Sequence, residues 1–218
     1  MSQLLDQLMD APDARLILDK MEQELKRESE QRKAFYDWIR EDQKAEFING
    51  EIILHSPVKR KHWKAVMLLS KLLDTYAAVY DLGEVATEKA MIALTRNDYE
   101  PDICFWSKEK TNAFDDNTML HPAPDLVIEV LSKSTAKNDR GIKLKDYAAH
   151  NIKEYWIIDP TKRHIEQNAL GDEGEYELKG KFTLSQVIES VVVAGFKIPV
   201  VAVFDAQENI KALKSLFG

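Results

Sequence analysis

The most informative segment of the chain begins with Pro122-Ala-Pro-Asp-Leu-Val-Ile-Glu-Val-Leu131 and closes with Glu154-Tyr-Trp-Ile-Ile-Asp-Pro160. Within it, Leu126–Leu131 is a short apolar run with β-branched residues, bounded by prolines before it and by hydroxyl residues after it. That pattern predicts a buried strand. Glu129 interrupts the run, and a carboxylate inside a buried strand is costly unless a metal ion, a lysine or an arginine pairs with it.

Alternation along this strand predicts two distinct faces. Asp125 and Glu129 share one face of the strand. Leu126, Ile128 and Val130 occupy the other, where we expect a helix to cover them.

A helix and a second strand follow. Ser134 or Asn138 is the candidate cap of a helix that runs to about His150. Lys143 lies at the edge of the apolar stripe of this helix, so its stem can be buried while its ammonium reaches a neighbouring site. Tyr155–Asp159 is the next strand, which completes a crossover unit with parallel strands.

Turn and periodicity signals organise the rest of the chain. Residues 1 to about 44 have a helical pattern, with Pro12 near a helix start and Asp10 as its candidate cap. Asn49-Gly50 between two apolar strands predicts a hairpin over 45–54. The other expected elements are a helix over 57–80, strands over 84–87, 90–94 and from 102, a turn at 96–99, a surface loop over 107–120, an edge hairpin over 164–178 and a helix from 205.

These elements predict an α/β protein with an N-terminal helical arm, residues 1–34, and one domain, residues 35–218. Phe35, Trp38 and Ile39 restore an apolar face by which the end of the helical region docks on the core. A long coiled coil is not expected, because the apolar repeat of the arm stops after Leu25.

Composition narrows the class of protein and of metal site. The 218 residues are 44% hydrophobic and 31% charged, and no apolar run approaches the roughly 20 residues of a membrane span. The single cysteine, Cys104, excludes an internal disulfide and fits a reducing cytoplasm. With only 5 histidines as well, a structural zinc site is not expected, so a metal would need oxygen ligands, as Mg²⁺ or Mn²⁺ does.

A net charge of −7 argues against general affinity for polyanions, yet two stretches are locally basic. Residues 57–64 contain no acidic residue, and Asp139 is the only acidic residue in 132–145. Such runs are either solvated faces or binding surfaces, and the candidates for DNA contact are Lys59, Arg60, Lys61, Lys64, Lys133, Lys137 and Arg140.

Three residues together suggest metal-dependent phosphodiester hydrolysis. Asp102 and Glu129 are acids on successive strands of the core, and Lys143 is a nearby lysine. Two carboxylates can hold an ion that neutralises phosphate charge and activates water, with the Val130 carbonyl as a further ligand. A lysine can position the water or stabilise developing negative charge, and Asp125 is an accessory acid on the same strand as Glu129.

The order of motifs resembles the Uma-two family ("putative restriction endonucleases") of the PD-(D/E)xK nuclease superfamily over roughly residues 32–204. The resemblance implies a mixed β-sheet flanked by helices, a restriction-endonuclease-like fold, with a carboxylate metal site. The matching motifs are Glu46…Asn49-Gly50-Glu51-Ile, His62, Pro101-Asp102-Ile, Pro124-Asp125-Leu-Val-Ile-Glu129-Val-Leu-Ser132-Lys-Ser134-Thr, Asp139…Lys143…Tyr147 and Glu154-Tyr-Trp-Ile-Ile-Asp159-Pro160.

The resemblance also implies roles for single residues. Asp102 takes the place of the first acid and Glu129 of the second, while Glu46 becomes an extra acid near the metal and His62 an accessory residue. The pattern has a lysine where this chain has Leu131. Superfamily members with this gap supply the lysine from the following helix, which Lys143 matches.

Two functions follow as hypotheses. The first is a Mg²⁺-dependent or Mn²⁺-dependent DNA endonuclease, cytoplasmic and without a membrane segment. The second is a catalytically inactive module of the same fold that binds DNA or a protein, because Leu131 replaces the usual lysine and the net charge is acidic. Dimerisation through the arm, giving a homodimer, is compatible with either hypothesis.

Overall fold

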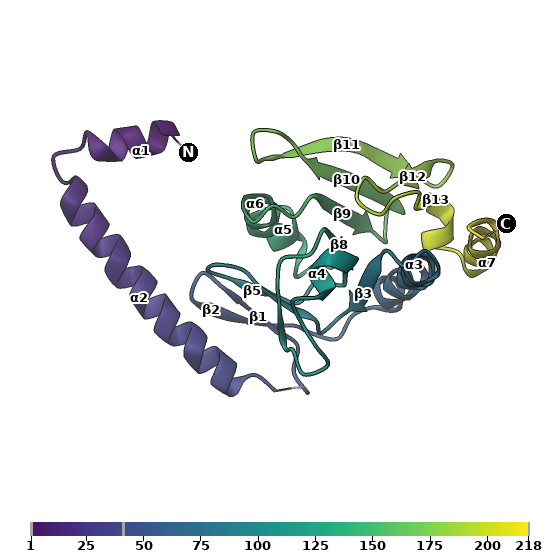
Figure 1. Cartoon of the computed structure of the whole chain (residues 1–218), viewed down its shortest axis with the longest axis horizontal. Coiled ribbons are helices and arrows are strands. Elements are labelled where there is room, and N and C mark those ends of the chain that lie inside the picture. Colours follow the sequence, from purple (N-terminus) through teal and green to yellow (C-terminus); the bar gives the residue numbers. More distant parts are fainter. Residues whose placement is uncertain (1, 41, 218) are drawn as a thin grey trace.

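A computed structural model describes residues 2–40 and 42–217, and residues 1, 41 and 218 of the predicted arm and domain lie outside the described residues. At its centre is a mixed six-stranded sheet in the order β11-β10-β9-β8-β6-β3, in which β8 and β9 are parallel and the other neighbours antiparallel (Figure 1). Its strands are β3 (Gly83–Thr87), β6 (Ile103–Ser107), β8 (Leu126–Val130), β9 (Glu154–Asp159), β10 (His164–Leu170) and β11 (Tyr176–Thr183).

The crossover between β8 and β9 confirms the predicted strand–helix–strand unit with parallel strands. The single predicted helix is instead two, α5 (Ala136–Asp139) and α6 (Ile142–Ala149). Gly141, with φ −116° and ψ −97°, leaves the helical conformation and separates them. The expected caps were wrong, because Thr135 precedes α5 and Asn138 lies inside it.

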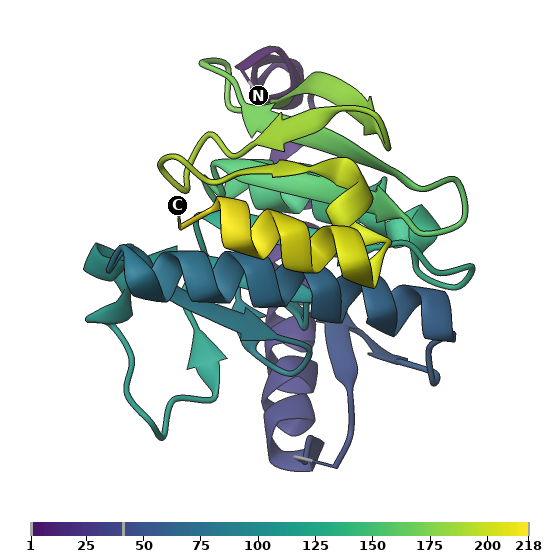
Figure 2. The same cartoon turned by 90° about the vertical axis from the view of Figure 1, so that its right-hand side faces the viewer.

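The two faces of the central sheet carry separate cores. Leu126, Ile128 and Val130 pack on the side of α3 (Arg60–Val79) and α7 (Ala206–Ser215), as their alternation predicted. Figure 2 shows these two helices side by side across that face. Val127 faces the opposite core, with the α6 residue Tyr147.

A second sheet of five short strands lies beyond the opposite core, in the order β2-β1-β5-β4-β7. The predicted hairpin is confirmed, since Asn49 (φ 51°) and Gly50 (φ 83°) make its turn in the left-handed region that such turns require. Asp98–Tyr99, expected within a turn, forms a strand. The sheet consists of β1 (Ala45–Ile48), β2 (Glu51–Leu54), β4 (Met91–Ala93), β5 (Asp98–Tyr99) and β7 (Leu120–His121).

The N-terminal region forms α1 (Ser2–Met9) and α2 (Ala14–Trp38), and Figure 1 shows α2 extending away from the sheets. The predicted cap at Asp10 was wrong. Pro12 lies in the turn between the helices, and Asp13 precedes α2.

The end of α2 docks on the five-stranded sheet, as expected. Phe35 is fully buried against Phe47 of β1, with ring centroids 5.7 Å apart. Arg32 donates to both carboxylate oxygens of the buried Asp98 in β5, at 2.5 and 2.7 Å, and Tyr36 donates to the same carboxylate at 2.8 Å. These contacts fix the direction of α2.

The predicted edge hairpin and C-terminal helix are both present. β10 and β11 form the hairpin at one edge of the central sheet. Asp205 caps α7 by accepting hydrogen bonds from the backbone N–H groups of Gln207 and Glu208. The expected loop over 107–120 contains one helical turn, and the remaining elements are α4 (Lys108–Thr111), β12 (Val187–Glu189), β13 (Lys197–Pro199) and the 3-10 helix η1 (Val200–Val203).

An ion cluster on β10 ties the crossover unit to the edge hairpin. Partial burial alone would raise the pKa of Glu166, but hydrogen bonds from Arg140, Lys181 and His164 lower it to about 2. Because the folded-state pKa lies below the ordinary 4.5, the cluster contributes stability above that value and loses it as pH falls toward 2.

Glu166→Gln is therefore expected to be less stable than the wild type at pH 7, on the order of 1 kcal/mol after solvent screening. This difference should vanish between about pH 5 and pH 2. Urea denaturation across that pH range measures it, with the exposed Glu173→Gln in the β10–β11 turn as control. A difference that persists unchanged at low pH would contradict the assignment.

Candidate active site

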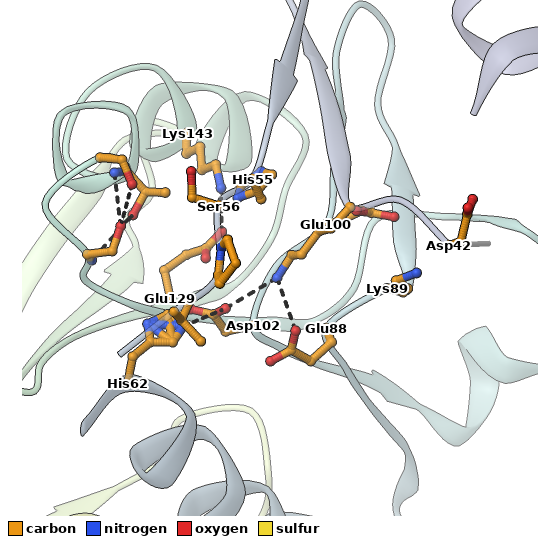
Figure 3. Close-up of a pocket in the computed structure, with 16 residues that line it drawn as sticks. Asp42, His55, Ser56, His62, Glu88, Lys89, Glu100, Asp102, Glu129 and Lys143 are labelled. Atoms are coloured by element: carbon orange, nitrogen blue, oxygen red, sulfur yellow. Dashed lines mark hydrogen bonds and ion pairs between the residues drawn. The ribbon is translucent and has the colours of Figure 1, made fainter. Parts of the chain in front are cut away.

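A cavity of about 330 Å³ opens where β8 ends, between the crossover unit and the start of α3. Asp102, Glu129 and Lys143, which the sequence predicted to meet, all line it, and so does His62. Figure 3 shows the two carboxylates between His62 and Lys143, which approach from different helices.

The two acids are neighbours because of strand register. Ile103 of β6 pairs with Ile128 of β8 in an antiparallel ladder, so the register places Asp102 opposite Glu129. Asp102 is held by the Val130 N–H, which donates to Oδ2 at 2.7 Å. Burial, together with the negative charge of Glu129, raises the pKa of Asp102 to about 7.

Lys143 is fully buried, 1% exposed, and its ammonium joins the two sheets. Its Nζ donates to Glu129 Oε1 at 2.8 Å and to Glu46 Oε1 at 2.7 Å, and it lies 3.5 Å from Asp139 Oδ1. Burial alone would lower the pKa of Lys143, but these carboxylates raise it well above its usual value. Tyr147 donates to the same oxygen of Glu129 at 3.1 Å.

Glu46 supports Lys143 from behind and does not line the cavity. It also accepts the Glu100 N–H at 3.1 Å, and its Oε2 lies 3.3 Å from His55 Nε2. Burial opposes ionisation, yet Lys143 and His55 lower the pKa of Glu46 to about 2. In this structure Glu46 contacts Lys143 and His55, and its role as an acid near the metal stays a prediction.

His62 reaches the site from the first turn of α3. Its Nε2 lies 3.2 Å from Asp102 Oδ1, within hydrogen-bonding distance, and burial lowers the pKa of His62. Among the described residues nothing hydrogen-bonds its buried Nδ1. The accessory role of His62 stays a prediction.

Asp125 lies elsewhere. Its carboxylate accepts the Ser107 N–H at 2.9 Å and lies 3.1 Å from Lys110 Nζ and 3.4 Å from Lys153 Nζ. Asp125 is not among the residues that line the cavity. Leu131, where the family pattern has a lysine, packs at the edge of the apolar core instead.

The predicted DNA-contact residues separate into groups. Lys59, Lys61 and Lys133 line a second cavity beside the first. Arg60 and Lys64 line a smaller hollow near Arg163. The other two lie apart, since Arg140 is paired with Glu166 and Lys137 is exposed outside these cavities.

Sequence reasoning missed several residues of the site. Lys44 lies with its Nζ 3.5 Å from Asp102 Oδ1 and 3.6 Å from Glu88 Oε2. Lys44 falls at the end of the region predicted to be helical, so no local pattern indicated that it reaches Asp102. Burial raises the pKa of Glu100 and of Asp139 to about 7. In the sequence, Asp139 lies within a basic run and a family motif, and Glu100 carries no predicted role.

The donor set fits a hard divalent cation. Across residues 2–40 and 42–217, no three His, Cys, Asp or Glu side chains gather as a ready-made metal site. Mg²⁺ does not require one, because it is commonly held by one or two carboxylates and completes its shell with water and phosphate oxygens. The hydrogen bonds that Glu129 accepts from described residues end on Oε1. Its Oε2 therefore remains available as a metal ligand beside Asp102.

The central mixed sheet, its flanking helices and the paired acids define a restriction-endonuclease-like fold. The same fold occurs in the crystal structure of "a putative nuclease belonging to DUF820" from Anabaena variabilis, with a TM-score of 0.67 and 16% identity over 78% of this chain and 94% of that one. That likeness concerns the fold alone.

The chain belongs to the Uma2 family, described as "Putative restriction endonuclease", whose model matches residues 32–201. Two uncharacterized proteins of Synechocystis are similar to it. One, sll1609, is 31% identical over 60% of this chain and 75% of its own length. The other, slr1290, is 28% identical over 63% of this chain and 72% of its own.

The Lys143 cluster leads to a stability prediction. Lys143→Met is expected to lose about 3–5 kcal/mol in urea denaturation, because it leaves buried carboxylates without their cation. Lys145→Met, on the exposed face of the same helix, is the matched control and should stay close to wild type. A Lys143→Met variant within about 1 kcal/mol of wild type would show that the cluster does not depend on the lysine charge.

Proposed function

We propose that the protein is a Mg²⁺-dependent or Mn²⁺-dependent DNA endonuclease. The observation that supports this most is the pair Asp102 and Glu129, side by side in a cavity and backed by the buried Lys143. Family membership adds support, since the family description names restriction endonucleases and restriction-endonuclease-like proteins generally use divalent metals.

In this proposal Asp102, Glu129 and the Val130 carbonyl hold the cation. When bound, it would neutralise phosphate charge and lower the pKa of the attacking water. The protein's own part is orientation. The Val130 N–H and His62 hold the Asp102 carboxylate from two sides, and Lys143 fixes Glu129 by its Oε1.

The cations of the site also act on the substrate. Lys44 is 18% exposed and lines the cavity, so its ammonium can meet a phosphate oxygen directly. Lys143 is too buried to be the first contact and contributes a fixed positive field from behind Glu129. Preorganised charges of this kind favour a transition state in which negative charge develops.

The test combines metal binding with cleavage. Asp102→Asn and Glu129→Gln should each lose the heat of Mn²⁺ binding in calorimetry and cleave supercoiled plasmid about 100-fold less or worse. Asp74→Asn, an exposed acid of α3 outside the cavity, is the control and should behave like wild type. Circular dichroism confirms that each variant is folded.

Unchanged cleavage by either acid variant would overturn the proposal. A wild-type protein that binds DNA in a salt-sensitive way, yet cleaves none with either metal, would instead identify the inactive module of the same fold.

We further propose that the protein is a homodimer in a reducing cytoplasm, which agrees with its single, buried Cys104. The dimer contact would be the arm. Leu18, Met21 and Leu25 are 44–50% exposed at helical spacing on α2. Separately, none of the described helices is long and apolar enough to cross a bilayer.

Light scattering after size-exclusion chromatography is expected to give twice the chain mass. Met21→Glu combined with Leu25→Glu should shift the protein to monomer, since the charges cannot be buried between helices. Lys20→Glu with Lys26→Glu on the same helix is the control. A wild-type monomer at high concentration would end this part of the proposal.

A further inference from the structure

A second cavity, of about 750 Å³, adjoins the candidate active site. Its walls come from three segments far apart in sequence: residues 56–62 before and within α3, residues 131–136 after β8, and residues 159–162 in the β9–β10 turn. The two cavities adjoin, because they share the wall residues Ser56, Pro57, Val58, His62, Ser132 and Ser134. We call the second cavity the lysine groove.

The lysine groove is strongly positive. Lys59, Lys61, Lys133 and Lys162 line it, and the fold brings each from one of the three segments. Its lining includes one acid, Asp159, whose Oδ1 already accepts the backbone N–H groups of the following turn at 2.8 Å.

Few neighbouring acids offset these lysines, although Asp159 interacts electrostatically with Lys162. In the part of the chain that the structure describes, no carboxylate forms an ion pair with any of the four groove lysines. Lys61 donates to the hydroxyl of Thr161, which links two of the walls. A concave surface with uncompensated charge concentrates its field on an anion, whereas a solvated face is convex and mixed in sign.

The chemistry of the groove suits phosphate. Lysine is a compact charge without the planar fork that reads guanine, and the hydroxyls of Ser132, Ser134 and Thr161 are ordinary phosphate donors. Among the described lining residues there is no Arg, Asn or Gln for base edges, and no Phe, Tyr or Trp for base stacking.

We propose that the lysine groove binds the sugar-phosphate backbone of one nucleic-acid strand, next to the phosphate that is cut, and that it does so without reading sequence. The occupant's class, nucleic acid, rests on the proposed function. The groove adds Thr161 and Lys162 to the contacts and gives the strand a direction, from the carboxylate pair along the end of β8 toward the β9–β10 turn.

The proposal also separates the basic residues by role. Lys133 lines the groove from the segment after β8 and Lys162 from the β9–β10 turn. Lys145 and Lys214 are exposed lysines of α6 and α7 outside the groove. Replacing either pair by alanine removes the same charge from the protein. Only replacement of the first pair removes charge from the groove along which the nucleic-acid backbone is proposed to run.

The experiment measures binding without cleavage. Fluorescence anisotropy of a short fluorescein-labelled DNA duplex is recorded in EDTA over a series of NaCl concentrations, with two duplexes of unrelated sequence. Relative to the Lys145→Ala/Lys214→Ala control, Lys133→Ala/Lys162→Ala should bind at least about tenfold more weakly and reduce the salt slope by about 2. Wild type should bind both duplexes alike.

Three results would overturn the groove: no binding by wild type at low salt, equal loss in the groove and control variants, or a marked preference for one duplex. Because EDTA removes catalysis, failure of the proposed endonuclease activity leaves this test intact. Groove-dependent binding by a protein that never cleaves would support the groove and reject the nuclease.

Discussion

The buried ammonium of Lys143 is the contact on which the site depends. It is held by Glu46 of the five-stranded sheet and by Glu129 of the six-stranded sheet, while its own helix belongs to the crossover unit. One charge thereby joins three elements. Burial of the ammonium alone would be prohibitive, and its neighbouring carboxylates raise the pKa of Lys143 well above its usual value. Lys143 in turn lowers the pKa of Glu46, although burial opposes this.

The same constraint shapes the cavity in front of the lysine. Asp102 lies opposite Glu129, and burial, followed by the negative charge of Glu129, raises its pKa to about 7 although Lys44 and the Val130 N–H oppose this. Lys44 and His62 approach Asp102 from two sides but leave the cavity open. A site of paired oxygen donors with incomplete charge compensation suits a divalent cation and a phosphate together.

The arrangement also explains how the chain departs from the family pattern. Leu131 occupies the position where a lysine is expected on the strand, and it packs at the edge of the apolar core. The lysine arrives from the following helix, and its ammonium still contacts Glu129.

Local patterns in the sequence determined a large part of this protein. Alternation placed Leu126, Ile128 and Val130 under a helix, Asn49-Gly50 specified a hairpin, and an acid within an apolar strand marked Glu129. These features depend on neighbours a few residues apart, which the sequence displays directly.

The tertiary structure alone decided what depends on distant neighbours. Lys44 and Asp102 are 58 residues apart in the chain, and Glu46 and Lys143 are 97 residues apart. The walls of the lysine groove come from segments up to about 100 residues apart. Electrostatic partners are chosen by distance in space, and a single sequence carries no record of that distance.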